Sequence, residues 1–344
     1  RLPPLPLVPL RPHPLREASV AWAVGRYLFA YDTASATWEQ CRKELHGDAV
    51  RALDAFVEQG DVFWISSGDD KQVRVWRERQ GEWELLQDLA HSKKVTAAAF
   101  DRTGQALFAD RFGDVYRWPC LTGDACAEPQ LLFSHLAIVT AMVLTESGRF
   151  LVTGDNHEKV RVSCYPGAAE IYSFCLGHTG QITALACLGD EALASASADG
   201  TLRLWHLDGE QLQQRDFGAP VSSLALTADG CAVAGCEAAR GLRRVGLRGG
   251  GAEEPEALAE ELPQAVCLLR AGAALWIDRA GHLRTRAASS GPWDHAFQGE
   301  DLPPALVCLS KHADPNWSEE AAVPEDAAGG SAEAPGHPRK RRAK

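Results

Sequence analysis

One segment of the chain, from Gly177 to Trp205, restricts the fold more than any other feature of the sequence. It reads G-H-T-G-Q-I-T-A-L-A-C-L-G-D-E-A-L-A-S-A-S-A-D-G-T-L-R-L-W. Its apolar residues alternate with small or polar ones, as expected for short strands that bury one face. Asp199 and Gly200 form a dipeptide that is typical of a tight turn between two such strands. The segment therefore predicts several short antiparallel strands joined by tight turns.

The same frame returns along the chain, with clear copies before Trp205 and fainter ones near both ends. Each copy closes at one position of the frame: Tyr31, Trp76, Trp118, Ser163, Trp205, Val245 and Arg286. Successive positions are 40 to 45 residues apart, which is the period of the blades in a propeller of WD repeats. Residues and period together resemble WD repeats. We therefore predict an all-β, WD-repeat β-propeller, with seven blades as the natural count and six or eight as alternatives; two packed β-sandwiches would not produce this period.

The segment also carries a set of polar residues that WD repeats use structurally. By that resemblance His178, Ser197, Asp199 and Trp205 would form a buried hydrogen-bond chain that holds the strand ends together. A His, an Asp and a Ser in one repeat could also suggest a catalytic triad. A triad is defined by geometry, however, and the repeat context already supplies a complete structural role. We predict no catalytic residue here.

The two ends of the chain differ in composition from the repeats. Residues 1–15 are rich in proline, which cannot form the apolar helix of a signal peptide, and we expect them to lie outside the fold. The propeller is predicted to span residues 16–312, with the segment 306–310 as a candidate strand that closes the first blade. Residues 313–344 contain almost no large apolar side chain, so disorder is expected there.

The chain ends in a basic run, which suggests a nuclear signal or a nucleic-acid patch and hence a nuclear location. A solvated tail without such a role is the alternative. The residues of this run are Arg339, Lys340, Arg341, Arg342 and Lys344.

Charge and cysteine spacing exclude several functions for the chain acting alone. A net charge of −11 argues against wrapping nucleic acid, because binding to phosphates depends on Lys and Arg. No apolar run approaches the length of a membrane helix. The ten cysteines form neither a C-x-x-C pair nor a Cys/His cluster at zinc spacing, which favours reduced thiols and no metal site. No G-x-G-x-x-G follows a strand, so no cofactor site is expected in this chain.

The repeat that closes at Ser163 departs from the others. It reads F-L-V-T-G-D-N-H-E-K-V-R-V-S and places Glu158, Lys159 and Arg161 around the turn. Lys159 and Arg161 alternate with valines, so both are predicted to project from one face of a strand. Two neighbouring cations would suit a pair of carboxylates on a partner. The alternative is a solvated strand face, since arginines occupy the same frame position in other repeats.

Together with S-F-C-L-G-H at 173–178 and A-D-R-F-G-D-V-Y at 109–116, this segment resembles the non-catalytic WD-repeat subunit of the tRNA (guanine-N7-)-methyltransferase. The resemblance implies a heterodimer in which this chain binds and stabilises a catalytic subunit that holds S-adenosylmethionine. The pair would methylate N7 of a guanosine in the tRNA variable loop. The resemblance also implies that Lys159 and Arg161, with the adjacent Glu158, contact the enzyme subunit.

Lys93 and Lys94 are predicted to lie in a loop between blades. They are candidates for contact with RNA in the complex, with solvated loop charges as the alternative.

Two other functions remain open. One is a scaffold or substrate receptor, for example in a ubiquitin ligase, where W-D-x-R often follows a repeat. Here R-E-R follows Trp76 and H-L-D follows Trp205, so neither repeat matches. The other is an enzyme, which would need ionisable groups converging on a pocket. The sequence shows no such cluster, so the hypothesis it favours is a non-enzymatic binding module.

Overall fold

The computed structural model describes residues 10–16, 19–32, 37–42, 46–79, 82–121, 128–167, 170–226, 231–236, 241–247, 256–259, 263–268, 273–278 and 283–287. All regular secondary structure in this part of the chain is β-strand, and the strands form seven antiparallel sheets. Strands follow one another across each sheet in sequence order, as expected when tight turns join neighbours. The described residues contain no helix that could cross a membrane.

The first four sheets have four strands each. The first contains β1 (Leu10–Pro12), β2 (Ser19–Val24), β3 (Tyr27–Asp32) and β4 (Thr37–Arg42). The second contains β5 (Val50–Glu58), β6 (Asp61–Gly68), β7 (Gln72–Arg79) and β8 (Glu82–Ala90). The third contains β9 (Val95–Phe100), β10 (Ala106–Asp110), β11 (Asp114–Trp118) and β12 (Gln130–Ser134). The fourth contains β13 (Val139–Leu144), β14 (Phe150–Asp155), β15 (Val160–Cys164) and β16 (Ile171–Cys175).

The remaining sheets continue the pattern. The fifth contains β17 (Ile182–Leu188), β18 (Ala192–Ser197), β19 (Thr201–His206) and β20 (Gln211–Asp216). The sixth contains β21 (Val221–Leu226), β22 (Cys231–Cys236), β23 (Gly241–Gly246) and β24 (Glu256–Ala259). The seventh contains β25 (Pro263–Leu268), β26 (Ala273–Asp278) and β27 (Leu283–Ala287).

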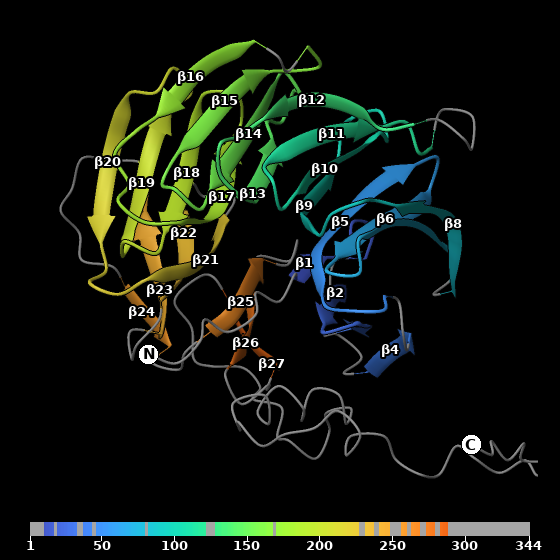
Figure 1. Ribbon diagram of the computed structural model, residues 1–344. Coiled ribbons are helices and arrows are strands. Elements are labelled where there is room, and N and C mark those ends of the chain that lie inside the picture. Colours follow the sequence, from blue (N-terminus) through green and yellow to red (C-terminus); the bar gives the residue numbers. More distant parts are fainter. Residues whose placement is uncertain are drawn as a thin grey trace, which may run out of the picture.

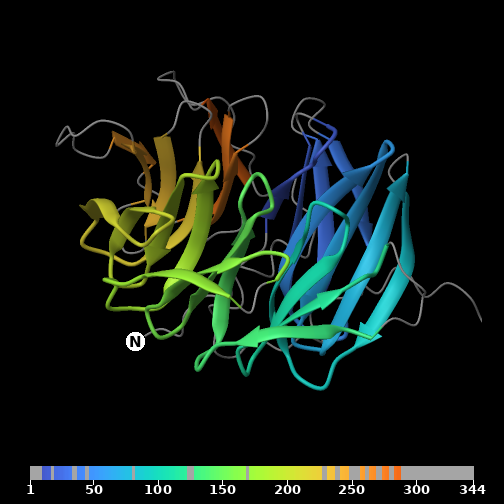
Figure 2. The same ribbon diagram turned by 90° about the horizontal axis from the view of Figure 1, so that it is seen from above.

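The sheets succeed one another around a ring (Figures 1 and 2). The first strand of each sheet contacts the first strand of the next, from β5 through β25, and β1 contacts both β25 and β5. This radial repetition is a WD-repeat β-propeller, as predicted. The seven predicted closing positions all fall on third strands, from β3 to β27. The seven described sheets are consistent with the predicted blade count.

The proline-rich start corrects one prediction. Leu10 pairs with Trp22 and Pro12 pairs with Val20, so β1 takes the first position of its sheet and joins the ring. The expectation that residues 1–15 lie outside the fold is therefore wrong for Leu10–Pro12. Proline density suggested a break, but a short edge strand tolerates Pro because its outer N–H groups need no partner within the sheet. The candidate closing strand 306–310 and the whole of 313–344, with its basic run, lie outside the described residues.

Burial follows strand position. The second strands β10 and β14 are buried throughout, whereas the fourth strand β20 is mostly exposed. Second strands are covered on both faces because neighbouring sheets pack against each other. Between the fourth and fifth sheets, for example, Val152 and Val162 pack in one cluster with Leu193 and Trp205.

Six cysteines of the described residues, at positions 120, 164, 175, 187, 231 and 236, are free thiols. Burial raises the pKa of Cys120 and of Cys175 to about 12. These thiols stay protonated at neutral pH and serve as small core residues.

Candidate functional site

A buried hydrogen-bond chain holds one end of the fifth sheet. His178 Nδ1 lies 2.9 Å from Asp199 Oδ2, and His178 Nε2 lies 2.7 Å from Ser195 Oγ. Trp205 Nε1 donates to the same Ser195 Oγ at 2.8 Å. These contacts join the loop before β17 to the turn between β18 and β19 and to the end of β19. We call the end of each sheet at which the second strand turns into the third the turn end.

The serine of this chain is Ser195, so the prediction of Ser197 is wrong. The register pairs Trp205 with Leu193, so Ser195, two residues along β18, is the nearest serine on the same face. Ser197 lies two residues further along, at the end of the strand, and its Oγ donates to Gly180 O at 3.0 Å. Both serines share one face, and only the cross-strand register distinguishes them.

Electrostatics agree with a structural role for this chain. Burial lowers the pKa of His178, an effect that outweighs the hydrogen bond to Asp199. For Asp199, burial acts to raise the pKa, but hydrogen bonds from Thr179, Thr201 and His178 outweigh it and lower the pKa to about 2. At neutral pH a neutral imidazole therefore faces an ionised carboxylate. Ser195 is 0% exposed, so no substrate could reach its hydroxyl.

The second sheet repeats this arrangement. His46 Nδ1 lies 2.9 Å from Asp70 Oδ1, and its Nε2 lies 2.8 Å from Ser66 Oγ. Trp76 Nε1 donates to Ser66 Oγ at 2.8 Å. Recurrence of one geometry in two sheets identifies it as the repeat's internal brace.

The fourth sheet keeps the histidine and aspartate but changes the rest. His135 bonds Asp155 at 3.3 Å and Thr153 at 2.8 Å. Ser163 stands at the position that Trp205 takes in the fifth sheet. Arg161 Nε donates to Ser163 Oγ at 2.9 Å, and its guanidinium carbon lies 3.9 Å from the centroid of the Phe133 ring.

Arg161 is therefore only 7% exposed, and it does not project beside Lys159. Lys159 lies in the turn before β15, which begins at Val160, so the alternation expected of a strand does not apply to it. The predicted pair of projecting cations is separated: Lys159 is exposed and Arg161 is buried. Arg161 acts as a packing residue beneath the turn.

The exposed part of this region is the β14–β15 turn itself. Asp155 Oδ1 accepts hydrogen bonds from the backbone N–H groups of His157 and Lys159, both at 2.9 Å. Glu158 adopts a left-handed conformation with φ of 73°. His157, Glu158 and Lys159 are all exposed, so a tightly bonded turn presents three polar side chains at the rim.

A row of exposed apolar side chains lies on the fourth strand of the same sheet, and sequence reasoning did not identify it as a surface. Tyr172 is 49% exposed, Phe174 41% and Leu176 63%. The register pairs Val160 with Cys175, so Lys159 and Leu176 extend their strands at the same end. Leu136, in the loop before β13, is 97% exposed. The signal was available: the fourth strand of the fifth sheet reads Q-L-Q-Q-R-D, whereas β16 reads I-Y-S-F-C.

The two lysines proposed to lie near RNA both contact carboxylates. Lys93 Nζ lies 3.8 Å from Asp110 and 3.6 Å from Asp114, and it also stands 4.0 Å from the centroid of the Phe112 ring. Lys94 Nζ lies 3.3 Å from Asp69. These ion pairs favour the alternative of loop charges for Lys93, whereas Lys94 lines a cavity.

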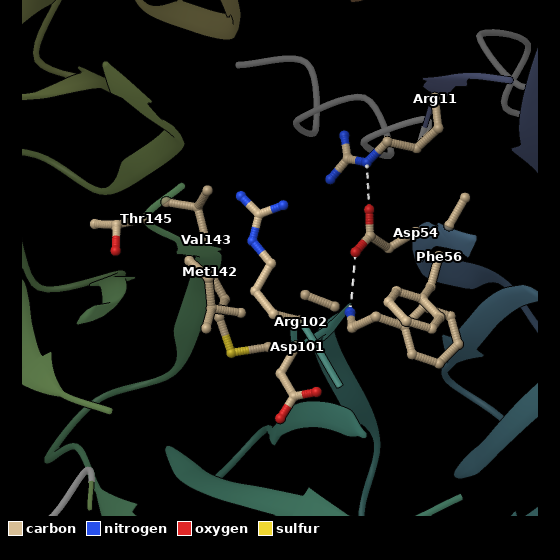
Figure 3. Close-up of a pocket in the computed structure, with 12 residues that line it drawn as sticks. Arg11, Asp54, Phe56, Asp101, Arg102, Met142, Val143 and Thr145 are labelled. Atoms are coloured by element: carbon tan, nitrogen blue, oxygen red, sulfur yellow. Dashed lines mark hydrogen bonds and ion pairs between the residues drawn. The ribbon is translucent and has the colours of Figure 1, made fainter. Parts of the chain in front are cut away.

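That cavity, of about 380 Å³, opens among the second, third and fourth sheets at the turn end. Another, of about 260 Å³, lies at the opposite end (Figure 3). In it Arg11 pairs with Asp54 at 3.4 Å, and Arg102 reaches into the same space beside Met142 and Val143. In the described part of the chain no group of three or more His, Cys, Asp or Glu side chains is placed to hold a metal.

The ring of sheets and the recurring His–Asp–Ser–Trp brace define a WD-repeat β-propeller. Residues 124–242 match the family described as the tRNA methyltransferase TRM82 WD40 domain, and residues 39–77 match the WD domain, G-beta repeat. The resemblance found from the sequence motifs is thus confirmed.

Curated relatives agree. The chain is 34% identical over 161 residues to the tRNA (guanine-N(7)-)-methyltransferase non-catalytic subunit wuho of Drosophila yakuba, covering 46% of this chain and 37% of the relative. It is 34% identical over 173 residues to the subunit of the same name in Drosophila melanogaster, covering 49% and 40%. The chain spans about two fifths of the length of these relatives. The names of these relatives describe them as non-catalytic subunits.

Among solved structures, the β-propeller domain of Cps50 (Swd1) from Myceliophteria thermophila is similar. Its TM-score is 0.66 at 15% sequence identity, covering 78% of this chain and 92% of that one. At this identity the likeness concerns the fold alone.

Proposed function

We propose that this chain is the non-catalytic subunit of a tRNA (guanine-N7-)-methyltransferase and that the catalytic subunit docks on the turn end of the fourth sheet. The observation that carries the proposal is the coincidence of two departures from the repeat in this one sheet. Its turn presents Glu158 and Lys159, and beside that turn its outer strand exposes Phe174, with Leu176 exposed directly after the strand. The match of residues 124–242 to the methyltransferase family includes the whole of this sheet.

The composition of this face suits a protein partner. Apolar side chains at the centre of an interface, with charged residues around them, are the usual anatomy of a specific contact. Exposed apolar patches of this kind mark interaction sites in soluble proteins. Arg161 supports the face from beneath, since its stacking on Phe133 joins the third and fourth sheets.

In this proposal the catalytic subunit supplies the chemistry. S-adenosylmethionine would bind to that subunit, and the pair would methylate N7 of a guanosine in the variable loop of tRNA. The brace residues of this chain are buried and paired, so the chain's contribution is to bind the enzyme and hold it in its active form. Contacts with tRNA would be made mainly by the complex. A nuclear location is proposed from the basic run at 339–344 alone.

The test is to co-express the chain with a guanine-N7 tRNA methyltransferase subunit from the same source, isolate the complex by size exclusion, and assay methyl transfer to tRNA. We expect co-elution and stimulated methylation. Lys159→Glu and Leu176→Asp should each weaken the complex about tenfold or more, because a reversed or buried charge at an interface costs several kcal/mol. Arg161→Glu would be a poor test, since Arg161 is buried and its replacement would disturb the sheet itself.

Lys71→Glu is the matched control, because Lys71 is an exposed lysine in the corresponding turn of the second sheet. It should leave co-elution unchanged. If both fourth-sheet variants form the complex as well as the wild type, the docking site is elsewhere. If the wild type neither co-elutes nor stimulates methylation, a scaffold for another complex becomes the better function.

A further inference from the structure

We propose that the cavity at the turn end of the second, third and fourth sheets binds the carboxylate of an acidic peptide segment. The inference rests on the proposed function only for the owner of that segment, which we assign to the docked catalytic subunit. Binding of an acidic peptide by this chain can be measured without that subunit.

The lining of the cavity is unusually basic for a chain with a net charge of −11. Arg51 from β5, Lys94 from the loop before β9, and Arg111 from the β10–β11 turn all line it, with Asp69 as the one acidic residue of the lining. Asp69 Oδ2 lies 2.6 Å from Arg51 and 3.3 Å from Lys94. Asp48 lies 3.9 Å from Lys94, outside the lining, and its side chain is 58% exposed. One carboxylate among three cations leaves a surplus of positive charge facing the cavity.

The positive charge that is available to a ligand is that of Arg111. It is exposed, and no ion pair within the described residues engages its side chain. Its backbone N–H donates to Lys94 O at 2.9 Å, which fixes the turn beside the other cations. The guanidinium that projects from this turn offers two parallel N–H donors to a carboxylate. The pKa of Asp69 is lowered: burial acts to raise it, but hydrogen bonds from Arg51 and Lys94 outweigh that effect. Asp69 therefore stays ionised and keeps Arg51 in place.

The rest of the lining favours a peptide over RNA. Its remaining residues are Thr96, Ile138 and Thr140, which offer methyl groups to an aliphatic stem and no aromatic face for a base. Proteins that bind single-stranded nucleic acid usually provide such faces. The neighbouring aromatic Phe112 is outside the lining, and Lys93 Nζ stands over its ring.

The cavity is also continuous with the proposed docking face. Ile138 N donates to Asn156 Oδ1 at 3.0 Å, and Asn156 N donates to Ile138 O at 2.9 Å. Asn156 belongs to the turn that presents Glu158 and Lys159. A partner seated on that turn could therefore place an acidic side chain in the cavity without leaving the face it covers.

The experiment uses the full chain and a fluorescein-labelled octaglutamate peptide, with binding followed by fluorescence anisotropy at about 50 mM salt, where surface charges are weakly screened. We expect saturable binding that Arg111→Glu weakens at least about tenfold and that Arg111→Lys weakens less. Arg102→Glu is the control, because Arg102 is likewise an exposed arginine lining a cavity, at the opposite end of the sheets. It should leave the affinity unchanged. Thermal unfolding of each variant shows that the fold is retained.

Three results would overturn the inference: no binding by the wild type at millimolar peptide, equal binding by Arg111→Glu, or equal losses for Arg102→Glu and Arg111→Glu. A labelled octauridylate RNA that binds more tightly than the peptide and loses affinity in Arg111→Glu would also overturn it, in favour of RNA. Peptide binding that depends on Arg111, found with a chain that does not co-elute with the methyltransferase subunit, would support the site while removing the proposed owner of its ligand.

Discussion

The fourth and fifth sheets share one frame but complete it with different residues. In the fifth sheet Trp205 fills the end of the third strand, and Arg203, two residues earlier, extends outward to bond Gln211 at 2.8 Å. In the fourth sheet Ser163 takes the tryptophan position, and Arg161 lies back over the strand toward it. The two arginines have equivalent partners across the sheet, since Thr153 pairs with Arg161 and Ser195 with Arg203.

The difference shows that the residue at the tryptophan position decides where the arginine goes. A tryptophan buries a large surface, and beside Trp205 the arginine stays half-buried, with its guanidinium carbon 5.9 Å from the centroid of the tryptophan ring. A serine leaves that volume to be filled, and the aliphatic stem and planar head of an arginine can fill it because the head stacks on Phe133. A cation that would otherwise be solvated becomes part of the packing.

The largest effect is expected from Trp205→Ala, which removes the side chain that distinguishes the fifth sheet from the fourth. Trp205 is 1% exposed and packs in the cluster between the fourth and fifth sheets. Its loss should reduce the free energy of unfolding by about 3–5 kcal/mol, measured by urea denaturation. A change below about 1 kcal/mol would show that the two sheets do not depend on this side chain for their packing.

Replacing the two arginines tests the comparison directly. Arg161→Ala should cost about 2 kcal/mol, because it removes a desolvated cation–π contact. Arg203→Ala should cost less than about 1 kcal/mol, because Arg203 is only half-buried, its guanidinium lies farther from a ring, at 5.9 Å, and its bond to Gln211 is exposed. Urea denaturation of both variants gives the difference. Equal costs would contradict a buried role for Arg161.

A further test places a tryptophan at position 163, where the fourth sheet has serine. Ser163→Trp alone should cost about 1–3 kcal/mol, because Arg161 occupies the space. Combined with Arg161→Ala, it should be less costly than the sum of the two single substitutions. Additivity in this double-mutant cycle would mean that the two side chains do not share one volume.

Only one of the two serines of β18 belongs to the brace of the fifth sheet, so their replacement should affect stability differently. Ser195→Ala should cost about 1–2 kcal/mol, because it leaves buried nitrogen atoms of His178 and Trp205 without a partner. Ser197→Ala should cost about half as much, since Ser197 Oγ donates to one backbone carbonyl and accepts from Asp199 N. The order of the two urea midpoints decides between Ser195 and the Ser197 suggested by the sequence.

The smallest expected effect is on pH dependence. The pKa of His178 is lowered by burial, so the unfolded state binds its proton first, and stability falls as the pH drops below about 6.5. Asp199, with a pKa of about 2, contributes stability above about pH 4 that is lost as the pH falls toward 2. The gap in urea midpoint between wild type and His178→Asn should therefore shrink from pH 7.5 to 5.5. A gap that widens would contradict a neutral buried imidazole.

Much of the fold could be predicted because its signals are local. These signals are alternating residues, Asp-Gly turns and a period of 40 to 45 residues, all of which are read along the chain. They located the third strand of each described sheet. The start of the ring was missed because proline density is a local signal too, whereas the contacts of β1 with β25 and β5 depend on the closing of the ring.

The sequence by itself determined the architecture, the turns and the departure of the fourth repeat, since each depends on neighbours in the chain. Only the tertiary structure chose Ser195 over Ser197 and buried Arg161, because these outcomes depend on cross-strand register and on the volume left by an absent tryptophan. The same holds for the basic cavity. Arg51 belongs to the second sheet, whereas Lys94 and Arg111 lie in loops of the third, and they meet because the first strands of neighbouring sheets pack side by side around the ring.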